Sequence, residues 1–274
     1  MDRRFFPGNA RVVLQGFEDG SADRSVVAGE RRSITSPVAP LRDAPAGKRD
    51  RELLFGDGFF SLDEADGWAF GRAEKDGYVG YLEASALGPA VEATHFVATR
   101  ATHAYAAPDV KAPDLYPLSF GSRVRVVAEE RTHLELQDGA HVPKSHLRPL
   151  EVPFQDMVTV AQLFFGTPYL WGGNSAWGID CSGLVQIAAV SAGRDCPADS
   201  DLQAAGFGDE IAMDAPVARG DLYFWKGHVA IAVDAGTLIH ANAHHMAVAY
   251  EPLEAALARI EAQEGAGMTV RRRV

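Results

Sequence analysis

Residues 178–193 read GIDCSGLVQIAAVSAG, and this stretch decides the fold of the C-terminal part of the chain. Apolar residues such as Leu184 and Ala188 recur at a helical spacing, which predicts a helix from Cys181 to a C-capping Gly193. A cysteine in the first turn faces free backbone N–H groups and the positive helix end, which favour the thiolate. Cys181 is therefore a candidate nucleophile, although a lone cysteine is more often a small buried apolar residue.

Two histidines lie in the apolar segments that follow. His228 begins one predicted strand and His240 lies near the end of the next. If residues 234–236 form a three-residue turn, Ala230 opposes His240, and the histidines become diagonal neighbours on one face, about 7–8 Å apart at the backbone. We expect the small residues of that face to leave room for the helix that carries Cys181. A turn of two or four residues would place the histidines on opposite faces.

The rest of the C-terminal part alternates further helices and strands. Helical spacing predicts a helix over residues 154–165 and another that starts at Pro252. Apolar runs predict strands over residues 221–225, 229–233 and 237–241. Helices and antiparallel strands in this order indicate the α+β class.

The same side chains allow other interpretations. Four of them could in principle bind zinc, but they lack the short spacing of zinc ligands, and no HExxH motif occurs. These four are Cys181, Cys196, His228 and His240. Ser182 lacks the G-x-S-x-G surroundings of a serine nucleophile. Two cysteines cannot form a disulfide framework, so we expect free thiols and a catalytically silent Cys196.

The N-terminal part has a different pattern of apolar residues. Residues 31–151 consist of short apolar runs separated by Gly, Asp and Pro, a pattern typical of small β-barrels. A weak repeat divides them, since the segment 76–87 returns as the segment 138–147, although β-rich stretches can resemble each other through their turns alone. We expect an irregular arm over 1–30, barrels over 31–89 and 90–152, and a third domain over 153–274.

Composition excludes several classes of partner. The 274 residues include 26 basic and 37 acidic side chains, which gives a formal net charge of -11. Only Arg271-Arg272-Arg273 resembles the basic stripe of a nucleic-acid binder. No apolar run approaches the roughly 18 residues that span a bilayer, and the first residues lack the apolar region of a signal peptide. We therefore expect a cytoplasmic protein with neither nucleic acid nor membrane as a partner.

Five separated segments carry a family resemblance. They read TPYLWGG (167–173), GIDCSGLVQ (178–186), RGDL (219–222), GHVAI (227–231) and LIHA (238–241). In order and spacing they resemble the NlpC/P60 cysteine peptidases. The resemblance implies a papain-like α+β domain in which Cys181 is the nucleophile, His228 the general base and acid, and His240 the residue that orients His228. It implies no cofactor and no metal.

The whole layout narrows the resemblance. Two bacterial SH3-like barrels before such a domain resemble the γ-D-glutamyl-L-diamino acid endopeptidases, which cleave murein stem peptides that have a free N-terminal L-alanine. By this resemblance Asp199 and Ser200 bind the substrate amine, and Asp180 and Ser182 flank the nucleophile. An ammonium group in a closed pocket needs such a carboxylate, although Asp199 could equally be a loop or N-cap residue. The other candidate substrate-binding residues are Tyr169, Trp171, Glu52, Tyr78 and Tyr81, each of which could instead only pack.

The resemblance implies a peptidase that releases L-Ala-D-Glu from murein peptides during cell-wall recycling. A wall-binding protein with a catalytically dead third domain is one rival, against which the intact Cys181, His228 and His240 argue. An amidase or acyltransferase that uses the same thioester is another. No basic side chain precedes Asp199 in Cys196-Pro197-Ala198, where a relative could place one to meet the D-glutamate carboxylate.

Overall fold

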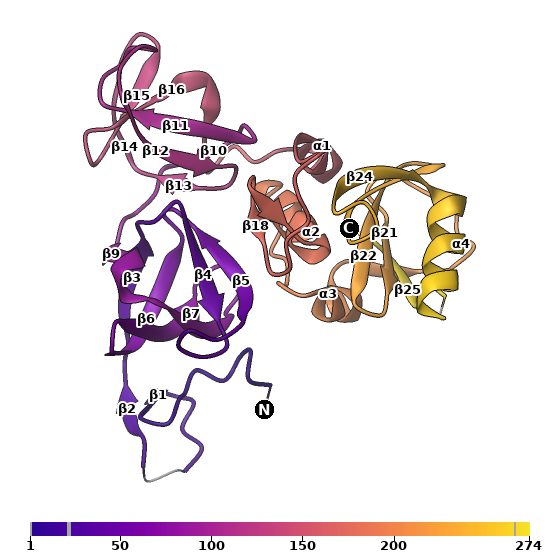
Figure 1. Ribbon diagram of the computed structural model, residues 1–274, viewed down its shortest axis with the longest axis horizontal. Helices are drawn as coiled ribbons and strands as arrows, with labels where there is room; N and C mark the ends of the chain where they lie inside the picture. The colour runs from indigo at the N-terminus through magenta and orange to yellow at the C-terminus, as the bar shows by residue number, and fades with distance from the viewer. Residues whose placement is uncertain (1, 21–22, 266) are drawn as a thin grey trace. The chain divides into compact units, whose positions relative to one another are not determined.

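The computed structural model describes residues 2–20, 23–265 and 267–274. The described chain divides into two compact units, one ending at Val152 and one comprising Pro153–Val274 (Figure 1). The N-terminal unit is made of β-sheets, and the C-terminal unit mixes helices with one large sheet. The predicted α+β class is confirmed.

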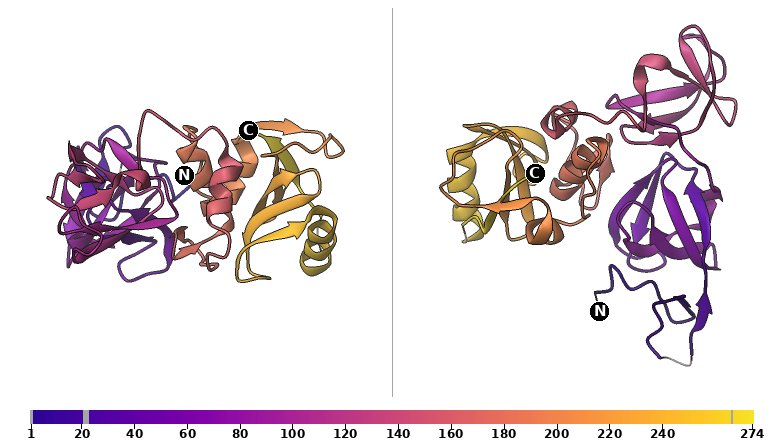
Figure 2. Two further views of the ribbon diagram at one scale, coloured as in Figure 1. Left: turned by 90° about the horizontal axis from the view of Figure 1, so that it is seen from above. Right: turned by 180° about the vertical axis from the view of Figure 1, so that it is seen from behind.

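The C-terminal unit is built on a six-stranded antiparallel sheet. Its strands are β20 (Asp209–Ile211), β21 (Leu222–Trp225), β22 (His228–Asp234), β23 (Thr237–Asn242), β24 (Ala247–Pro252) and β25 (Val270–Arg273). Their spatial order is β20-β25-β21-β22-β23-β24. The helices are α1 (Met157–Leu163), α2 (Cys181–Ser191), α3 (Ser200–Gly206) and α4 (Leu253–Glu264), and the short strands β18 (Asn174–Ser175) and β19 (Gly178–Ile179) pair before α2. Figure 2 shows the large sheet between α2 on one side and α4 on the other.

Helix α2 confirms the predicted helix at Cys181. It starts there because the Asp180 side chain caps it, accepting a hydrogen bond from the Gly183 backbone N–H at 2.7 Å. Gly183 itself must be glycine, since a Cβ at this position would approach the carbonyl oxygen of Gly173 to 2.6 Å. The helix ends at Ser191, before Gly193 with its positive φ of 75°. The local sequence therefore places the Cys181 thiol at a fixed helix start.

The hairpin β22–β23 has the predicted register, but its turn is shorter than predicted and a β-bulge makes up the difference. Ile231 pairs with Ile239, as expected, but Asp234 pairs with Thr237, so the turn contains only two residues. The register shifts around Val233, where a β-bulge adds one residue to β22. A two-residue turn alone would have placed His228 and His240 on opposite faces. The extra residue of the bulge reverses the alternation of side chains in β22, so the two histidines lie on the same face.

The face that carries the histidines is covered by α4, which corrects one expectation. Ala230 and Ala232 pack against Leu253, Ala256 and Ile260 of α4 in one buried cluster. Small residues are needed there because α4 lies close over the strands, so the room they leave is not used by α2. Helix α2 packs on the opposite face and brings Cys181 to the first residues of β22.

The three arginines of β25 form an internal clasp rather than a basic stripe. Arg271 is 1% exposed and donates to Asp221 Oδ2 at 3.1 Å and to the carbonyl oxygens of Ala212, Met213 and Ala215. Arg273 also donates to Asp221, at 2.7 and 2.8 Å. Arg272 donates to backbone carbonyls of the segment 204–208. Hydrogen bonds within the fold thus hold all three guanidinium groups.

We expect Asp221→Ala to destabilise the C-terminal unit strongly. Asp221 is fully buried, and its loss leaves the Arg271 guanidinium buried without its carboxylate, which typically costs about 3–5 kcal/mol. Urea unfolding followed by circular dichroism measures the change. Arg219→Ala removes the exposed partner of Asp156 and should cost less than about 1 kcal/mol. Equal losses for the two variants would contradict this account of the clasp.

The first barrel of the N-terminal unit is a seven-stranded sheet. Its strands are β3 (Glu30–Ile34), β4 (Val38–Arg42), β5 (Arg49–Leu54), β6 (Gly58–Ala65), β7 (Trp68–Ala73), β8 (Val79–Glu83) and β9 (Leu87–Pro89), in the order β5-β4-β8-β7-β6-β3-β9. Neighbouring strands are antiparallel. Its buried side chains include Ile34, Leu41, Leu53, Phe59 and Leu82.

The second barrel contains two smaller sheets. Its strands are β10 (His95–Val97), β11 (Ala101–Tyr105), β12 (Asp114–Ser119), β13 (Arg123–Val124), β14 (Val126–Glu129), β15 (His133–Leu136), β16 (His141–Pro143) and β17 (Leu147–Pro149). They form the sheets β12-β11-β16-β15-β14 and β13-β10-β17. Both barrels end in the same way, with a strand, a 3-10 turn (Ala84–Ala86 or Lys144–His146) and a last short strand. The segments that repeat in the sequence thus adopt the same structure.

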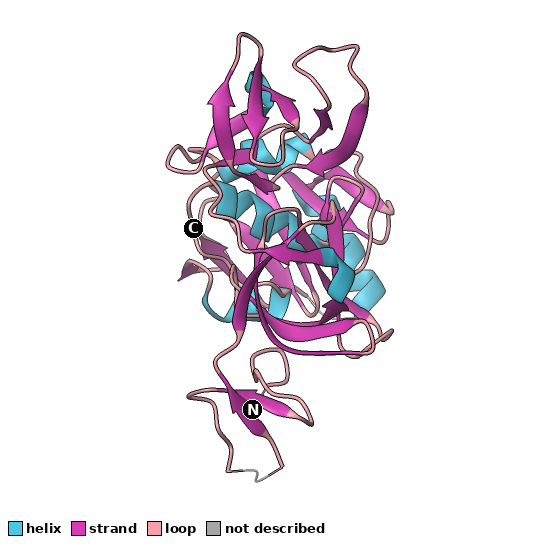
Figure 3. Cartoon of the chain, turned by 90° about the vertical axis from the view of Figure 1, so that its left-hand side faces the viewer, coloured by secondary structure: helices cyan, strands magenta, loops and turns pink. Residues whose placement is uncertain are grey.

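The N-terminal arm is more ordered than its sequence indicated. It contains two short parallel strands, β1 (Val12–Leu14) and β2 (Ser25–Val27), visible in Figure 3. Val12 packs in a buried cluster with Leu62 and Phe70 of the first barrel. These few apolar residues lack a detectable period, so the contact of Val12 with the barrel was not visible in the sequence.

Candidate active site

The Cys181 thiol lies at the start of α2, against the first residues of β22. The side chain is buried, and its sulfur is 4.0 Å from the carbonyl oxygen of Gly227. Backbone N–H groups of Val229, Ser182 and Cys181 itself interact with the sulfur and favour its charged form. The sulfur therefore contacts the backbone on both sides of His228.

The two predicted histidines are in direct contact. Nε2 of His228 lies 2.9 Å from Nδ1 of His240, which is fully buried. Nε2 of His240 lies 3.0 Å from Oε2 of Glu251 on β24. Arg259 of α4 donates from Nε and Nη2 to the two oxygens of that carboxylate, at 2.8 Å each. The structure thus extends the expected pair into a chain of four side chains.

The electrostatics of Cys181 differ from the expectation. Burial, followed by the nearby Asp180 carboxylate, raises the pKa of the Cys181 thiol to about 12, and the backbone N–H groups offset this only in part. The expected lowering by the helix start is wrong for the resting site, because desolvation of the thiolate outweighs it. At neutral pH the sulfur is a thiol that needs a base to remove its proton.

Both histidines are neutral at neutral pH. Burial lowers the pKa of His228 to about 3 and that of His240 to about 4, although Glu251 favours the charged form of each. The hydrogen bonds from Arg259 lower the pKa of Glu251 to about 2, so this carboxyl is ionised. Since a neutral imidazole carries a single N–H, each ring has one nitrogen that can accept a proton.

We expect the C-terminal unit to lose stability as the pH falls from 7 to 5. The folded pKa values of both histidines lie below the unfolded value of 6.5, so over this range the unfolded chain binds protons that the folded chain does not. This stability is present above pH 6.5 and is lost below it, by at most about 2 kcal/mol per histidine at pH 5. Urea unfolding at the two pH values measures it.

The matched variants are His228→Asn and His244→Asn. His228→Asn should reduce the pH dependence, whereas His244→Asn removes an exposed side chain of the same unit and should leave it unchanged. A wild-type slope in His228→Asn would show that the burial of this ring does not govern the effect.

Asp180 and Ser182 form a rigid network around the nucleophile. Oδ1 of Asp180 accepts from the Ser182 hydroxyl at 3.1 Å, and Oδ2 accepts from the Gly172 backbone N–H at 2.8 Å. Tyr169 is half-buried nearby, and burial and the charges of Cys181 and Asp180 raise its pKa. Trp171 is 69% exposed. The expected contacts of these residues with a substrate remain predictions.

The segment that contains Asp199 and Ser200 lies beside the start of α2. Gln203 of α3, fully buried, donates to the carbonyl oxygens of Ser182 and Pro197 at 3.0 and 2.9 Å. Asp199 occupies the N-cap position of α3, but among the described residues its carboxylate makes no capping hydrogen bond. Asp199 thus stands at an N-cap position, one of the two expected alternatives, and its contact with a substrate remains a prediction.

The three candidate residues of the first barrel are Glu52, Tyr78 and Tyr81. Glu52 is 5% exposed and lies 3.7 Å from Arg49, and Tyr78 is buried with its ring against Phe5 of the arm. Tyr81 is half-buried and packs on Phe70. Their packing within the barrel accounts for Tyr78 and Tyr81, and an additional role in binding remains a prediction.

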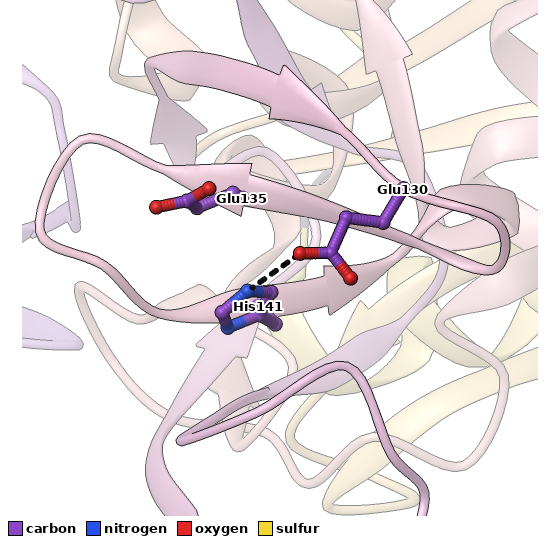
Figure 4. Close-up of side chains that lie close together, drawn as sticks. All are labelled: Glu130, Glu135 and His141. Carbon is purple, nitrogen blue, oxygen red and sulfur yellow. Dashed lines mark ion pairs between the residues drawn. The ribbon is translucent and has the colours of Figure 1, made fainter.

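Within the described residues, one group has the composition and proximity of a metal site. It is Glu130, Glu135 and His141 of the second barrel, not the cysteines and histidines of α2 and the hairpin (Figure 4). Nε2 of His141 lies 3.4 Å from Oε1 of Glu130, a direct contact that brings these two side chains together without a metal ion. Cys196 is a buried free thiol that accepts from Gln203 Nε2 at 3.7 Å.

Glu251 and Arg259 are the site residues that the sequence analysis missed. The β23–β24 register pairs His240 with Ala249, which makes Glu251 a neighbour two residues along the same face. An acidic residue at the end of an apolar strand, followed by an arginine on the next helix, was the available signal. It could be interpreted only once β24 was known to pair with β23.

Two stretches of the chain match known protein families. Residues 166–260 match the NlpC/P60 family, and residues 41–87 match the bacterial dipeptidyl-peptidase SH3 domain. The solved structure of an NlpC/P60 family protein from Bacillus cereus superposes with a TM-score of 0.75 at 21% identity, over 89% of this chain and 99% of that one. At this identity the likeness shows a shared fold.

Curated relatives have consistent names. A γ-D-glutamyl-L-lysine dipeptidyl-peptidase of Bacillus cereus is 29% identical over 154 residues, which are 53% of this chain and 45% of that protein. A dipeptidyl-peptidase 6 of Lysinibacillus sphaericus is 36% identical over 88 residues, which are 32% of each chain. The matches thus cover less than half the length of these relatives. Among the described helices, none is both long and apolar enough to cross a membrane.

Proposed function

We propose that this chain, in which an NlpC/P60 domain follows a bacterial dipeptidyl-peptidase SH3 domain, hydrolyses the γ-D-glutamyl bond to the diamino acid in murein stem peptides. The observation that carries the proposal is the Cys181 thiol beside β22, whose first residue, His228, is hydrogen-bonded to His240. The names of the curated relatives support the choice of bond. Recycling of wall peptides in the cytoplasm is the setting we propose.

The chemistry follows from the neutral thiol and imidazole. His228 takes the thiol proton as Sγ of Cys181 attacks the γ-carbonyl carbon of D-glutamate, and a tetrahedral oxyanion forms. Backbone N–H groups at the start of α2 lie where they can stabilise that charge. The oxyanion then collapses, the C–N bond breaks, and the imidazolium gives its proton to the leaving amine of the diamino acid.

The second half of the reaction releases the acid. Water attacks the thioester carbonyl while His228 takes one of its protons, the C–S bond breaks, and the proton returns to the sulfur. The product is L-Ala-D-Glu when the substrate is L-Ala-γ-D-Glu-diamino acid. Asp199 and Ser200 are our candidates for binding the free ammonium group of L-alanine, because they begin the short helix α3, whose Gln203 donates to the Ser182 carbonyl next to the nucleophile.

The decisive experiment offers two tripeptides, L-Ala-γ-D-Glu-L-Lys and L-Ala-γ-D-Glu-meso-diaminopimelate. Mass spectrometry should detect L-Ala-D-Glu and the free diamino acid from at least one of them, and hydrolysis in H₂¹⁸O should label the new carboxylate. Binding without turnover would favour a wall-binding protein. Transfer of the acyl group to an added amine in preference to water would favour an acyltransferase.

A further inference from the structure

Beyond the three expected catalytic residues, Cys181, His228 and His240, the site contains a buried contact between His240 and Glu251. The acceptor is a carboxylate whose position is fixed, since Glu251 lies in β24 opposite Leu238 of β23 and Arg259 of α4 donates to both of its oxygens at 2.8 Å. Arg259 is itself held by Gln263 one turn further along α4, at 2.9 Å. Glu251 is 7% exposed, so water contributes little to its solvation.

We propose that Glu251, held by Arg259, is a positioning residue that fixes the tautomers of both histidines and leaves Nδ1 of His228 as the proton acceptor for Cys181. The inference rests on the proposed function, because it assumes that His228 is the base. It goes further by stating which nitrogen acts, and which residues outside the triad decide this.

The assignment follows from counting hydrogens along the chain of contacts. An ionised carboxylate can only accept, so the 3.0 Å contact requires a hydrogen on Nε2 of His240. A neutral ring has one such hydrogen, which leaves Nδ1 of His240 as an acceptor. The 2.9 Å contact then requires a hydrogen on Nε2 of His228, and Nδ1 of His228 is left unprotonated.

The opposite pair of tautomers is unfavourable at one contact, that between Nε2 of His240 and Glu251. If Nδ1 of His240 carried the hydrogen, its bare Nε2 would face the Glu251 carboxylate, and two acceptors would repel each other at 3.0 Å. His228 would then be protonated on Nδ1 and could not receive the thiol proton. Protein hydrogen positions follow from such networks of partners, and here the network admits one solution.

The role of Glu251 is one of geometry more than of charge. Arg259 offsets its negative charge, and their opposite effects on the pKa of His228 leave burial as the main influence. His228 and His245 are further titratable groups that act on His240. Removing the charge of Glu251 while keeping its shape should therefore act mainly through the tautomers.

The first test reads the tautomers directly in the wild-type protein. Two-bond ¹⁵N–¹H correlation spectra of ¹⁵N-histidine-labelled protein at pH 7 distinguish protonated from bare ring nitrogens, and the signals of His228 and His240 are assigned by their loss in His228→Gln and His240→Gln. We expect a hydrogen on Nε2 and a bare Nδ1 in both rings. A hydrogen on Nδ1 of His228 would overturn the proposal, whatever the substrate is.

The second test changes the acceptor. In Glu251→Gln the amide can donate to Nε2 of His240, so the wrong tautomers gain population, and kcat should fall by about 10- to 100-fold with KM changed less than about twofold. Alkylation of Cys181 by iodoacetamide should slow by a similar factor. Glu254→Gln, an exposed change of the same kind three residues further on, in α4, should leave both rates unchanged.

Arg259→Met separates positioning from stability. It removes the support of Glu251 but keeps the carboxylate, so the fold should be destabilised while both rings keep their tautomers. A loss of kcat in Glu251→Gln that only matches that of Arg259→Met, with unchanged tautomers in both, would overturn the proposal in favour of a structural role. If the tautomers are as expected but no stem peptide is cleaved, the proposed function fails and the tautomer assignment stands.

Discussion

Cys181→Ala should lower kcat for tripeptide hydrolysis by about 10⁴-fold or more, with the fold intact. Alanine removes only the sulfur, and both the capping carboxylate of Asp180 and the apolar contacts of α2 remain. The neighbouring hydroxyl, that of Ser182, lacks the surroundings of a serine nucleophile and donates its hydrogen to Asp180 Oδ1 at 3.1 Å. Discontinuous product analysis by mass spectrometry measures the rate, and circular dichroism checks the fold.

The matched control is Cys196→Ser. This thiol lies at 3% exposure and accepts a hydrogen bond from Gln203 Nε2, so its replacement by serine should leave the reduced protein active. His228→Ala should be nearly as damaging as Cys181→Ala, and His240→Ala milder, since it orients the base. Unchanged turnover in Cys181→Ala would end the cysteine-peptidase proposal, and loss of activity in Cys196→Ser would show that the two thiols are assigned wrongly.

Asp199→Ala should lower kcat/KM for substrates with a charged N-terminal amine and have little effect on substrates whose amine is blocked. If Asp199 pairs with the ammonium group of L-alanine, Asp199→Ala leaves a desolvated charge without its partner, which typically costs about 2–5 kcal/mol. The corresponding loss of kcat/KM is about thirtyfold to several-thousandfold for L-Ala-γ-D-Glu-diamino acid. N-acetylated tripeptide lacks the charge, so its already poor hydrolysis should change little.

The comparison needs four rates, namely two substrates with the wild type and with Asp199→Ala. Asp201→Ala is the matched control, since Asp201 is an acidic residue of the same short helix α3. Equal rates on free and acetylated tripeptide in the wild type would remove the dipeptidyl-peptidase assignment and leave a general wall endopeptidase. A uniform loss on both substrates in Asp199→Ala would indicate that this residue supports the segment rather than the amine.

The sequence predicted the local parts of the site because their causes are local. Periodicity and the Asp180 cap are enough to place Cys181 at a helix start, and a confirmed register places His228 and His240 on one face. The bulge at Val233 was not predictable, since nothing in its side chain distinguishes it from its neighbours. The expected hairpin had two errors, a turn one residue too long and no bulge. These errors cancelled, so the expected register was right.

The remaining features depend on long-range packing. The raised thiol pKa comes from the burial of Cys181 by the whole unit, which outweighs the helix start that the sequence shows. Glu251 became visible only through its pairing with β23, and Arg259 only through the position of α4. The clasp of Asp221 likewise joins residues from distant parts of the chain, so three consecutive arginines looked like a surface patch.

The place of β25 between β20 and β21 has a consequence for synthesis on the ribosome. Leu222 pairs with Arg272, so the large sheet stays in two pieces until the segment 270–273 has left the exit tunnel. Pairing between segments this distant in the sequence makes folding slow. During synthesis the chain therefore carries Cys181, His228 and His240 before the sheet that presents both histidines is complete.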